Sequence, residues 1–288
     1  MSHHTQRLAF LFPGQGSQQV GMGKDLAERY PAARQTFAEA DAALGFSLSS
    51  LCWEGPEEKL RMTEFTQPAI LTASVAALRV LEEKGVAPSW AAGHSLGEYS
   101  AHVAAGTLRF ADAVRTVRNR GRYMQEAVPQ GEGAMAAILG LPLELVQQVC
   151  REAAQGEVVS PANINSPEQI VISGAKAAVE RASELAKERG AKRAVLLSVS
   201  APFHCTLMQP AQERLAADLQ AATFQVPQIA VVNNVDAVLT NAAEEARDAL
   251  VRQVTGAVRW VECIEALVRA GAEAFLEVGP GKVLSGLM

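Results

Sequence analysis

The 288-residue chain has room for one large domain, or for one domain that carries a second, smaller one. Its 49% apolar and 20% charged residues are typical of a globular protein, and its net charge of -5 argues against a nucleic-acid partner. The 4 cysteines form no Cys-x-x-Cys pair or zinc spacing, and no apolar stretch is long enough for a membrane span. We therefore expect a cytoplasmic protein with reduced thiols, no metal site and no membrane contact.

The first part of the chain alternates between short apolar runs and helical patterns, which predicts a mainly parallel sheet. For the helix expected at 70–84, Thr66 is the expected N-cap, Pro68 lies in the first turn and Gly85 is placed to end the helix. The full set expected here is strands at 7–12 and 90–92, and helices at 23–30, 70–84, 98–105 and 110–127.

The middle of the chain has a different order of elements. Strands are expected at 134–139, 158–164, 169–173 and 194–199, with helices at 142–154 and 177–189. This β-α-β-β-α-β order is typical of a ferredoxin-like unit. We therefore predict a ferredoxin-like subdomain over 127–200, inserted into an α/β-hydrolase-like core formed by 1–126 and 201–288. The core is expected to resume with helices at 208–222, 244–254 and 260–270 and strands at 229–233 and 274–278.

The pentapeptide Gly93-His94-Ser95-Leu96-Gly97 fits the Gly-x-Ser-x-Gly nucleophile elbow. In an elbow the serine lies on a strained turn between a strand and a helix, and the two glycines let these elements pass closely. A serine exposed in this way suggests acyl transfer through a covalent ester. The pattern also occurs by chance in glycine-rich loops, so the motif alone leaves that alternative open.

A serine nucleophile needs a base, and His204 is the best candidate among the histidines. It follows a predicted strand, where the subdomain returns to the core, and the order Ser…His matches α/β-hydrolases. His94 is expected to shape the pocket wall, and a structural role for His204 remains the alternative. No acidic residue between Ser95 and His204 follows a strand convincingly. We therefore predict a Ser-His dyad whose imidazole is oriented by a backbone carbonyl.

Arg120 lies at the edge of the apolar stripe of the helix at 110–127, whereas the neighbouring arginines lie on the opposite side. An arginine directed toward the core needs a partner, because an unpaired buried guanidinium is costly. The partner is either an internal carboxylate or a carboxylate on the substrate, and the sequence leaves both open.

The turn that follows the first predicted strand contains Gln15 and is a candidate for the oxyanion hole. In elbow enzymes one donor is the N–H of the residue after the serine, here Leu96, and the other comes from a separate strand-to-helix loop. The turn is not Gly-x-Gly-x-x-Gly because position 19 is Gln, which excludes the dinucleotide fingerprint. The segment 279–282 lacks the remaining residues of a phosphate loop.

These pieces resemble the malonyl-CoA:acyl carrier protein transacylase family of fatty acid synthesis over almost the whole chain. The resemblance rests on separated motifs: FPGQGSQ at 12–18, GHSLGEYSA at 93–101, RGRYMQEA at 120–127, NINSPEQIVISG at 163–174, SAPFHCTLM at 200–208, LVRQ at 250–253 and EVGPGKVLSGL at 277–287. Chains of the family usually continue past the last motif, which has little bearing on the site.

The resemblance implies a role for each candidate residue. Ser95 would carry the malonyl group, His204 would act as base and then acid, and Arg120 would bind the free malonyl carboxylate. The N–H groups of Gln15 and Leu96 would form the oxyanion hole. The carbonyl of Gln253 would orient His204, which fits the missing acid.

The resemblance also implies pocket-lining residues. Asn163 and Asn165 are expected on the subdomain side, along the path of the pantetheine arm. In related domains of polyketide synthases a Phe just before the histidine accompanies malonyl rather than methylmalonyl, so Phe203 implies a preference for malonyl.

The implied reaction moves malonyl from malonyl-CoA to the phosphopantetheine thiol of acyl carrier protein by double displacement, without a cofactor, and we expect a monomer. A serine thioesterase or esterase and a non-catalytic carrier-binding module remain alternatives. Carrier proteins are acidic, so a basic cluster at the end of a subdomain helix is a candidate docking surface, although a charge run of this kind is more often a solvated face. It comprises Lys187, Arg189, Lys192 and Arg193.

Overall fold

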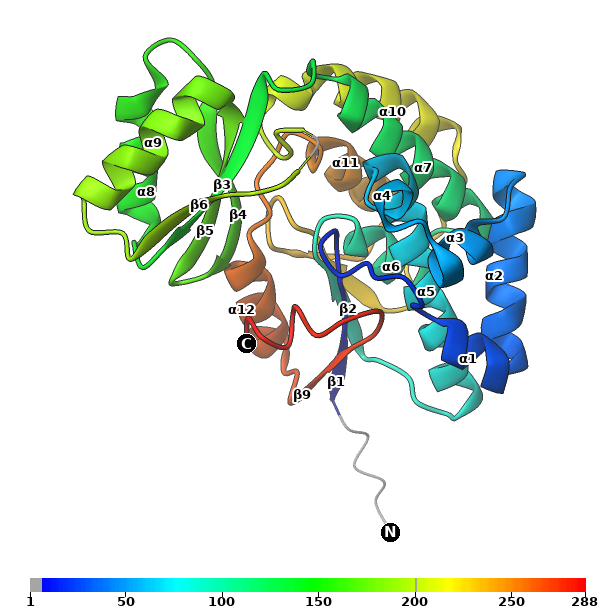
Figure 1. Ribbon diagram of the computed structural model, residues 1–288. Helices are drawn as coiled ribbons and strands as arrows, with labels where there is room; N and C mark the ends of the chain where they lie inside the picture. The colour runs from blue at the N-terminus through cyan, green and yellow to red at the C-terminus, as the bar shows by residue number, and fades with distance from the viewer. Residues whose placement is uncertain (1–6, 200) are drawn as a thin grey trace.

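The computed structural model describes residues 7–199 and 201–288, which form two β-sheets with helices packed around them (Figure 1). The larger sheet has the strand order β8-β7-β2-β1-β9. β1 runs parallel to β2 and β9, β2 runs parallel to β7, and β8 pairs antiparallel with β7. The strands are β1 (Leu8–Phe12), β2 (Trp90–Gly93), β7 (Ala230–Val232), β8 (Leu239–Thr240) and β9 (Ala274–Glu277).

Helices cover both faces of this sheet, so the interior strand β1 is buried on both sides. Phe10 and Phe12 pack in a cluster with residues of α5 and α6, whereas Ala9 and Leu11 pack with residues of α12. Continuous burial of this kind is typical of a parallel sheet between two helical layers. The helices of this part are α1 (Lys24–Arg29), α2 (Pro31–Leu44), α3 (Leu48–Glu54), α4 (Glu57–Leu60), α5 (Thr63–Glu83), α6 (Gly97–Ala104), α7 (Phe110–Glu126), α10 (Gln209–Ala221), α11 (Ala243–Arg252) and α12 (Trp260–Ala270). A 3₁₀ turn, η1 (Thr206–Met208), precedes α10.

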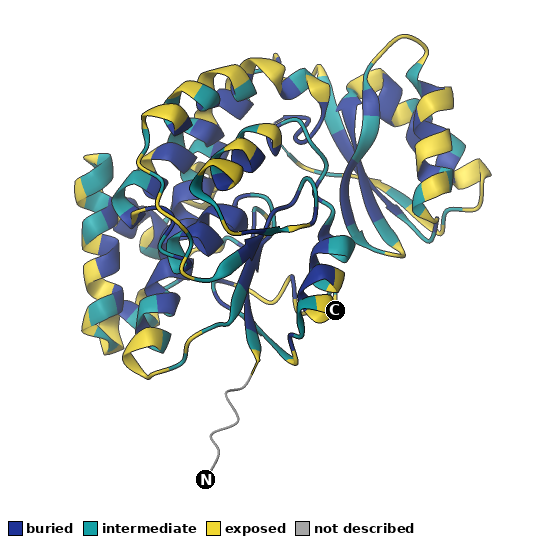
Figure 2. Ribbon diagram, turned by 180° about the vertical axis from the view of Figure 1, so that it is seen from behind, coloured by how far each residue is buried: buried dark blue, intermediate teal, exposed yellow. Residues whose placement is uncertain are grey.

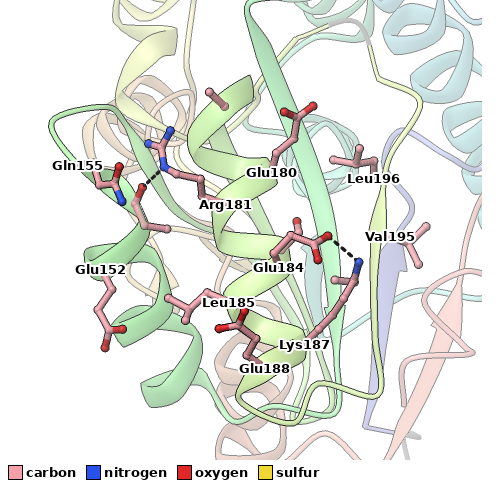
Figure 3. Close-up of a pocket in the computed structure, with 14 residues that line it drawn as sticks. Glu152, Gln155, Glu180, Arg181, Glu184, Leu185, Lys187, Glu188, Val195 and Leu196 are labelled. Carbon is pink, nitrogen blue, oxygen red and sulfur yellow. Dashed lines mark hydrogen bonds and ion pairs between the residues drawn. The ribbon is translucent and has the colours of Figure 1, made fainter.

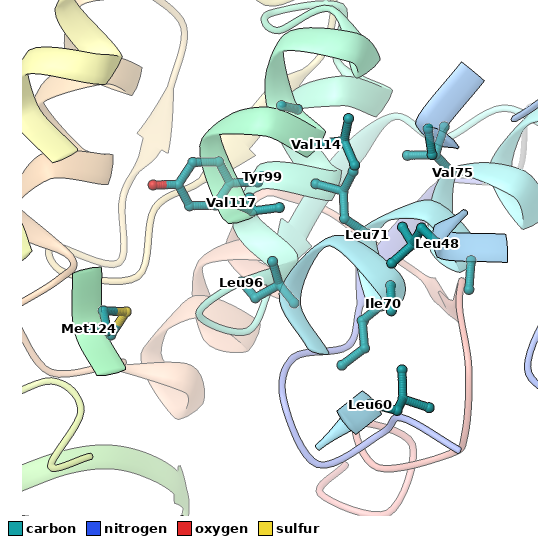
Figure 4. Packing of buried hydrophobic residues seen from close by; sticks show 14 of the residues in the cluster. Leu48, Leu60, Ile70, Leu71, Val75, Leu96, Tyr99, Val114, Val117 and Met124 are labelled. Atoms are coloured by element: carbon teal, nitrogen blue, oxygen red, sulfur yellow. The ribbon is translucent and has the colours of Figure 1, made fainter. Parts of the chain in front are cut away.

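The two long helices α5 and α7 pack against each other in the largest apolar cluster of the described residues. Figure 4 shows Ile70 and Leu71 of α5 near Val114 and Val117 of α7, and all four are fully buried. This packing fixes the face of α7 that turns inward, which is the face that carries Arg120.

The prediction of Thr66 as an N-cap is wrong, because α5 begins at Thr63. The Thr66 hydroxyl lies inside the helix and donates to the carbonyls of Leu60, at 2.6 Å, and Met62, at 3.1 Å. The expected stop is correct: Gly85 adopts φ 74° directly after the C-cap, a conformation that glycine adopts without strain.

The smaller sheet is antiparallel throughout, with the strand order β4-β5-β3-β6. Its elements follow the predicted β-α-β-β-α-β order: β3 (Gly133–Leu139), α8 (Leu143–Ala154), β4 (Val159–Ser166), β5 (Gln169–Ala175), α9 (Lys176–Glu188) and β6 (Arg193–Leu196). Figure 2 shows the inner strands β3 and β5 largely buried, and the helices buried on one side and exposed on the other, whereas the edge strand β6 is mostly exposed. Ser200, where the predicted subdomain ends, lies outside the described residues.

A backbone bridge joins the smaller sheet to the segment that precedes α12. The N–H of Ile164 in β4 donates to the carbonyl of Val258, at 2.9 Å, and the N–H of Val258 donates to the carbonyl of Ala162, at 2.8 Å. The smaller sheet is therefore held against the segment that precedes α12. Across 7–199 and 201–288, no helix is both long and apolar enough to cross a membrane.

Candidate active site

Ser95 lies on a tight turn between β2 and α6 and has the left-handed backbone angle φ 52°. The flanking glycines are required by close packing. A Cβ on Gly93 would lie 1.9 Å from the carbonyl carbon of Gly97, and a Cβ on Gly97 would lie 2.1 Å from the carbonyl oxygen of Phe12. Such distances are impossible for any side chain, so the Gly-x-Ser-x-Gly spacing is dictated by the geometry of the turn.

The strained turn is held by Asn234, which follows β7. Its Oδ1 accepts a hydrogen bond from the Ser95 N–H at 2.7 Å, and its Nδ2 donates to the Gly93 carbonyl at 2.8 Å. These bonds satisfy backbone groups that the sharp turn leaves without partners in regular structure.

His204 lies against the serine, with its Nε2 at 2.7 Å from Ser95 Oγ. Its Nδ1 lies 2.8 Å from the carbonyl oxygen of Gln253 and 3.1 Å from that of Gly256. Carbonyls only accept, so Nδ1 carries the proton and Nε2 keeps a lone pair that can accept the serine proton. Among the described residues, no carboxylate contacts this imidazole.

Burial, together with the nearby Arg120 charge, lowers the pKa of His204 to about 3. The imidazole is thus neutral at physiological pH, as a general base must be.

Arg120 is almost fully buried, as its place on the helical stripe predicts. Its Nη1 donates to Gln67 Oε1 at 2.9 Å, and its Nη2 donates to Gln253 Oε1 at 2.8 Å and to Ser95 Oγ at 3.1 Å. No ion pair to Arg120 is found in the part of the chain that the structure describes. The sequence left two partners open for Arg120, an internal carboxylate and a substrate carboxylate. In the structure, no internal carboxylate of the described residues contacts the guanidinium.

A cavity of about 120 Å³ opens over the serine. Its polar lining includes the candidate catalytic side chains, and its apolar lining comes from α7, the smaller sheet and the segments that follow it. The lining residues are Gln15, Gln67, His94, Ser95, Leu96, Arg120, Met124, Met135, Asn163, Leu197, Val199, Phe203 and His204. Within the described residues, the backbone N–H groups of Gln15 and Leu96 donate to no other protein group.

Three of the four predicted pocket-lining residues, His94, Asn163 and Phe203, line this cavity. Asn165 lies behind it instead. Its Oδ1 is 2.8 Å from His94 Nε2, and the residue borders a separate surface hollow beside Trp260. Asn165 therefore contacts the elbow through His94.

Sequence reasoning missed four functional contacts: Asn234, Gln67, Glu98 and the side chain of Gln253. Asn234 and Gln67 are polar residues beside apolar stretches, and Glu98 is the one carboxylate of its helix. A polar residue in such a position could have indicated a buried contact, because buried polar groups require hydrogen-bond partners. Their partners, however, lie up to 158 positions away in the chain, as for Gln253 and Ser95.

The remaining potentially reactive groups lie outside the site. All four cysteines are free and buried, and burial raises their pKa values. The described residues contain no cluster of three or more His, Cys, Asp or Glu side chains arranged to hold a metal ion.

An elbow serine paired with an imidazole on a parallel sheet defines the class of α/β proteins that form acyl esters. Residues 9–286 match the family of the acyl transferase domain. A malonyl CoA-acyl carrier protein transacylase of Escherichia coli strain K12 is 56% identical over 98% of this chain and 91% of that protein.

Solved structures agree with this match. An acyl carrier protein S-malonyltransferase from Vibrio cholerae superposes with a TM-score of 0.96 at 54% identity, over 98% of this chain and 92% of that one. The structure of a type II PKS acyl-carrier protein in complex with its malonyl-transacylase gives the same TM-score, identity and coverage. The chain belongs to the family of malonyl CoA-acyl carrier protein transacylases.

Proposed function

We propose that this chain transfers the malonyl group of malonyl-CoA to the phosphopantetheine thiol of acyl carrier protein through an ester on Ser95. One observation carries the proposal: Ser95 Oγ lies 2.7 Å from His204 Nε2 and 3.1 Å from Arg120 Nη2. The nucleophile thus touches both a neutral base and a guanidinium suited to a carboxylate. The high identity to transacylases over nearly the whole chain supports this substrate pair.

In the first half-reaction, Ser95 Oγ attacks the thioester carbonyl carbon while His204 Nε2 takes the hydroxyl proton. The oxygen of the carbonyl becomes an oxyanion, which the free N–H groups of Gln15 and Leu96 stabilise. The C–S bond then breaks, and His204 gives its proton to the CoA sulfur. The products are CoA thiol and malonyl-Ser95.

The second half-reaction runs through the same groups in reverse. The pantetheine thiol gives its proton to His204 and attacks the ester carbonyl carbon. The C–O bond to Ser95 breaks, and His204 returns the proton to the serine oxygen. Every proton in both steps is carried by His204, and the carbonyl of Gln253 keeps its Nδ1 protonated, so we propose that no cofactor takes part.

Arg120 supplies the selectivity for malonyl. Its guanidinium is held by neutral amides and faces the cavity, so a substrate carboxylate would be its first full counter-charge in contact. Hydrogen bonds to a charged group contribute about 1.5–3 kcal/mol each. An acetyl group would leave the buried guanidinium without that partner.

The finer description of the fold is also a proposal. The elbow between β2 and α6 supports an α/β-hydrolase-like core over 1–126 and 201–288. The order β4-β5-β3-β6, with α8 and α9 against the sheet, supports a ferredoxin-like subdomain over 127–200.

We further propose that the protein is monomeric and cytoplasmic. Its four free thiols support the cytoplasmic location.

The predicted docking cluster has less electrostatic support than its sequence suggests. Lys187 pairs with Glu184, Arg189 with Glu152 and Lys192 with Glu168. Figure 3 shows the groove between α8, α9 and β6, where Glu180 and Glu188 add further carboxylates. An acidic carrier gains little at such a surface, so docking there stays a prediction.

The transfer is tested by following CoA release with malonyl-CoA alone and then with carrier protein. We expect one rapid turnover of CoA per enzyme, followed by steady release when the thiol acceptor is added. Continuous release without an acceptor would instead identify a thioesterase. No release under either condition would favour the non-catalytic binding module.

A further inference from the structure

Behind the serine, the carboxylate of Glu98 is fully buried on α6. Its Oε2 accepts hydrogen bonds from Gln253 Nε2 at 2.7 Å and from the Asn234 N–H at 3.1 Å. Its Oε1 lies 4.0 Å from His102 Nε2, and neither of these two atoms has a hydrogen-bond partner among residues 7–199 and 201–288. Glu98 does not line the cavity, so it does not touch the substrate.

Contacts at both ends hold the Gln253 amide in one orientation, and Glu98 supplies the shortest of those at Nε2. The Nε2 group faces three acceptors: the Glu98 carboxylate at 2.7 Å, the Ser95 carbonyl at 2.9 Å and Asn234 Oδ1 at 3.4 Å. The amide Oε1 faces a donor, Arg120 Nη2, at 2.8 Å. The reversed amide would direct an NH₂ group at the guanidinium and an oxygen at a carboxylate, which is unfavourable at both ends.

Gln253 therefore acts through two separate groups. Its backbone carbonyl orients His204, and this bond does not depend on the side chain. Its side-chain oxygen orients Arg120, and this bond depends on which way the amide is turned. Since Glu98 reaches the guanidinium by hydrogen bonds through this amide, removal of Glu98 should affect Arg120 and leave the base in place.

We propose that Glu98 is a positioning residue for acyl-group selectivity, which fixes the Arg120 guanidinium over Ser95 through the Gln253 amide. The inference rests on the proposed malonyl transfer and deepens it. A buried carboxylate is costly to maintain, and burial raises the pKa of Glu98 to about 7. A side chain that served packing alone would fill this space better with apolar atoms.

The decisive experiment measures kcat/KM of the loading step for malonyl-CoA and for acetyl-CoA. Glu98→Met fills a similar volume without an acceptor, and we expect about a tenfold loss of malonyl preference, since one hydrogen bond to a charged group is weakened. Loading of acetyl-CoA, which has no carboxylate, should change far less. Glu98→Gln keeps one acceptor oxygen for both donors, so we expect it to restore the preference.

Gln253→Ala removes the amide while keeping the backbone carbonyl that holds His204. We expect the same loss of preference, and the double variant Glu98→Met/Gln253→Ala should be no worse than Gln253→Ala, because the two residues act in series. Ser100→Ala is the matched control: Ser100 is buried on the same helix, and its hydroxyl has no partner within the described residues.

The two proposals fail in different ways. If the unaltered chain does not load malonyl, the proposed function is wrong. If it does, but Glu98→Met keeps full malonyl preference, the positioning role is wrong. If circular dichroism shows that Glu98→Met does not fold, the Gln253→Ala variant provides the test. An unchanged preference for malonyl over acetyl in Gln253→Ala would then overturn the inference.

Discussion

The five-stranded and four-stranded sheets border the same cavity but present different kinds of side chain to it. Strands of the parallel sheet end together, so the residues that follow them converge: Gln15 after β1, Ser95 after β2 and Asn234 after β7. The antiparallel sheet contributes Met135 and Asn163 from strand interiors. The carboxyl edge of a parallel sheet thus gathers reactive groups, whereas the second sheet supplies a wall.

The same contrast holds in the interior. Glu98, His102, Arg120 and His204 are all buried within the parallel half. In the second sheet and its two helices, the buried polar side chains of the described residues are neutral, namely Asn163, Ser173 and Ser183. The buried ionisable side chains, and the desolvation cost of keeping them there, are therefore concentrated in the half built on the parallel sheet.

The largest effect is expected from His204→Ala. Loss of the general base should lower kcat for loading by about 10²- to 10⁴-fold. Stopped-flow measurement of CoA release checks this. The control is His102→Asn, a buried histidine outside the cavity, and an equal loss in both variants would contradict the assignment of the base.

Arg120→Ala should lower kcat/KM for malonyl-CoA by about 10- to 150-fold, which corresponds to about 1.5–3 kcal/mol. Acetyl-CoA should become the relatively better substrate, because it needs no guanidinium. The exposed Arg122 on the same helix provides the control Arg122→Ala. Unchanged discrimination in Arg120→Ala would contradict the role of the guanidinium.

Acid should destabilise the parallel half through His102. Burial lowers its pKa to about 3 from 6.5, so the unfolded chain takes up a proton below pH 6.5 that the folded chain does not. Stability then falls as the pH falls. Glu98 acts oppositely, because its raised pKa means that the folded chain retains a proton between 4.5 and about 7.

The free energy of unfolding should fall when the pH is lowered from about 6.5 to 5, and urea unfolding measures this fall. We expect the fall to be about 1.5 kcal/mol smaller in His102→Asn than in the unaltered chain. Val149→Ala in the second sheet's core should lower stability equally at both pH values. An unchanged pH slope in His102→Asn would show that this histidine does not titrate as its burial indicates.

The smallest effect is expected from Asn163→Ala, in the wall formed by the second sheet. A wall residue binds the ground state and the transition state alike, so KM should rise by less than about tenfold at constant kcat. Steady-state kinetics with both thioesters test this. A large fall in kcat would place chemistry in the second sheet and remove the contrast.

Much of the fold was predictable because its signals are local. The elbow around Ser95, the stop at Gly85 and the inward face of Arg120 each follow from spacing within a few turns of chain. Thr66 was misassigned since a hydroxyl that caps a helix and one that bonds back to its own helix look alike in sequence. The helices α2 and α3 were not predicted, although Pro31 and the buried Phe37 mark the first of them.

The residues of the candidate site were predictable only where the type of side chain itself indicates a catalytic or binding role. Serine, histidine and arginine have distinctive roles, the elbow pattern indicated Gln15 and Leu96, and the resemblance supplied the Gln253 carbonyl. The supporting contacts were not predictable, because Asn234 and Glu98 meet their partners through tertiary packing. A buried amide becomes informative only when its neighbours are known.

The proposed mechanism requires that Ser95 carries malonyl as a covalent ester. Mass spectrometry of the intact protein after mixing with malonyl-CoA detects this ester, with Ser95→Ala measured in parallel. We expect a single malonyl adduct on Ser95, which is absent from the variant and lost when a carrier thiol is added. An adduct on another residue, or CoA release without any adduct, would contradict it.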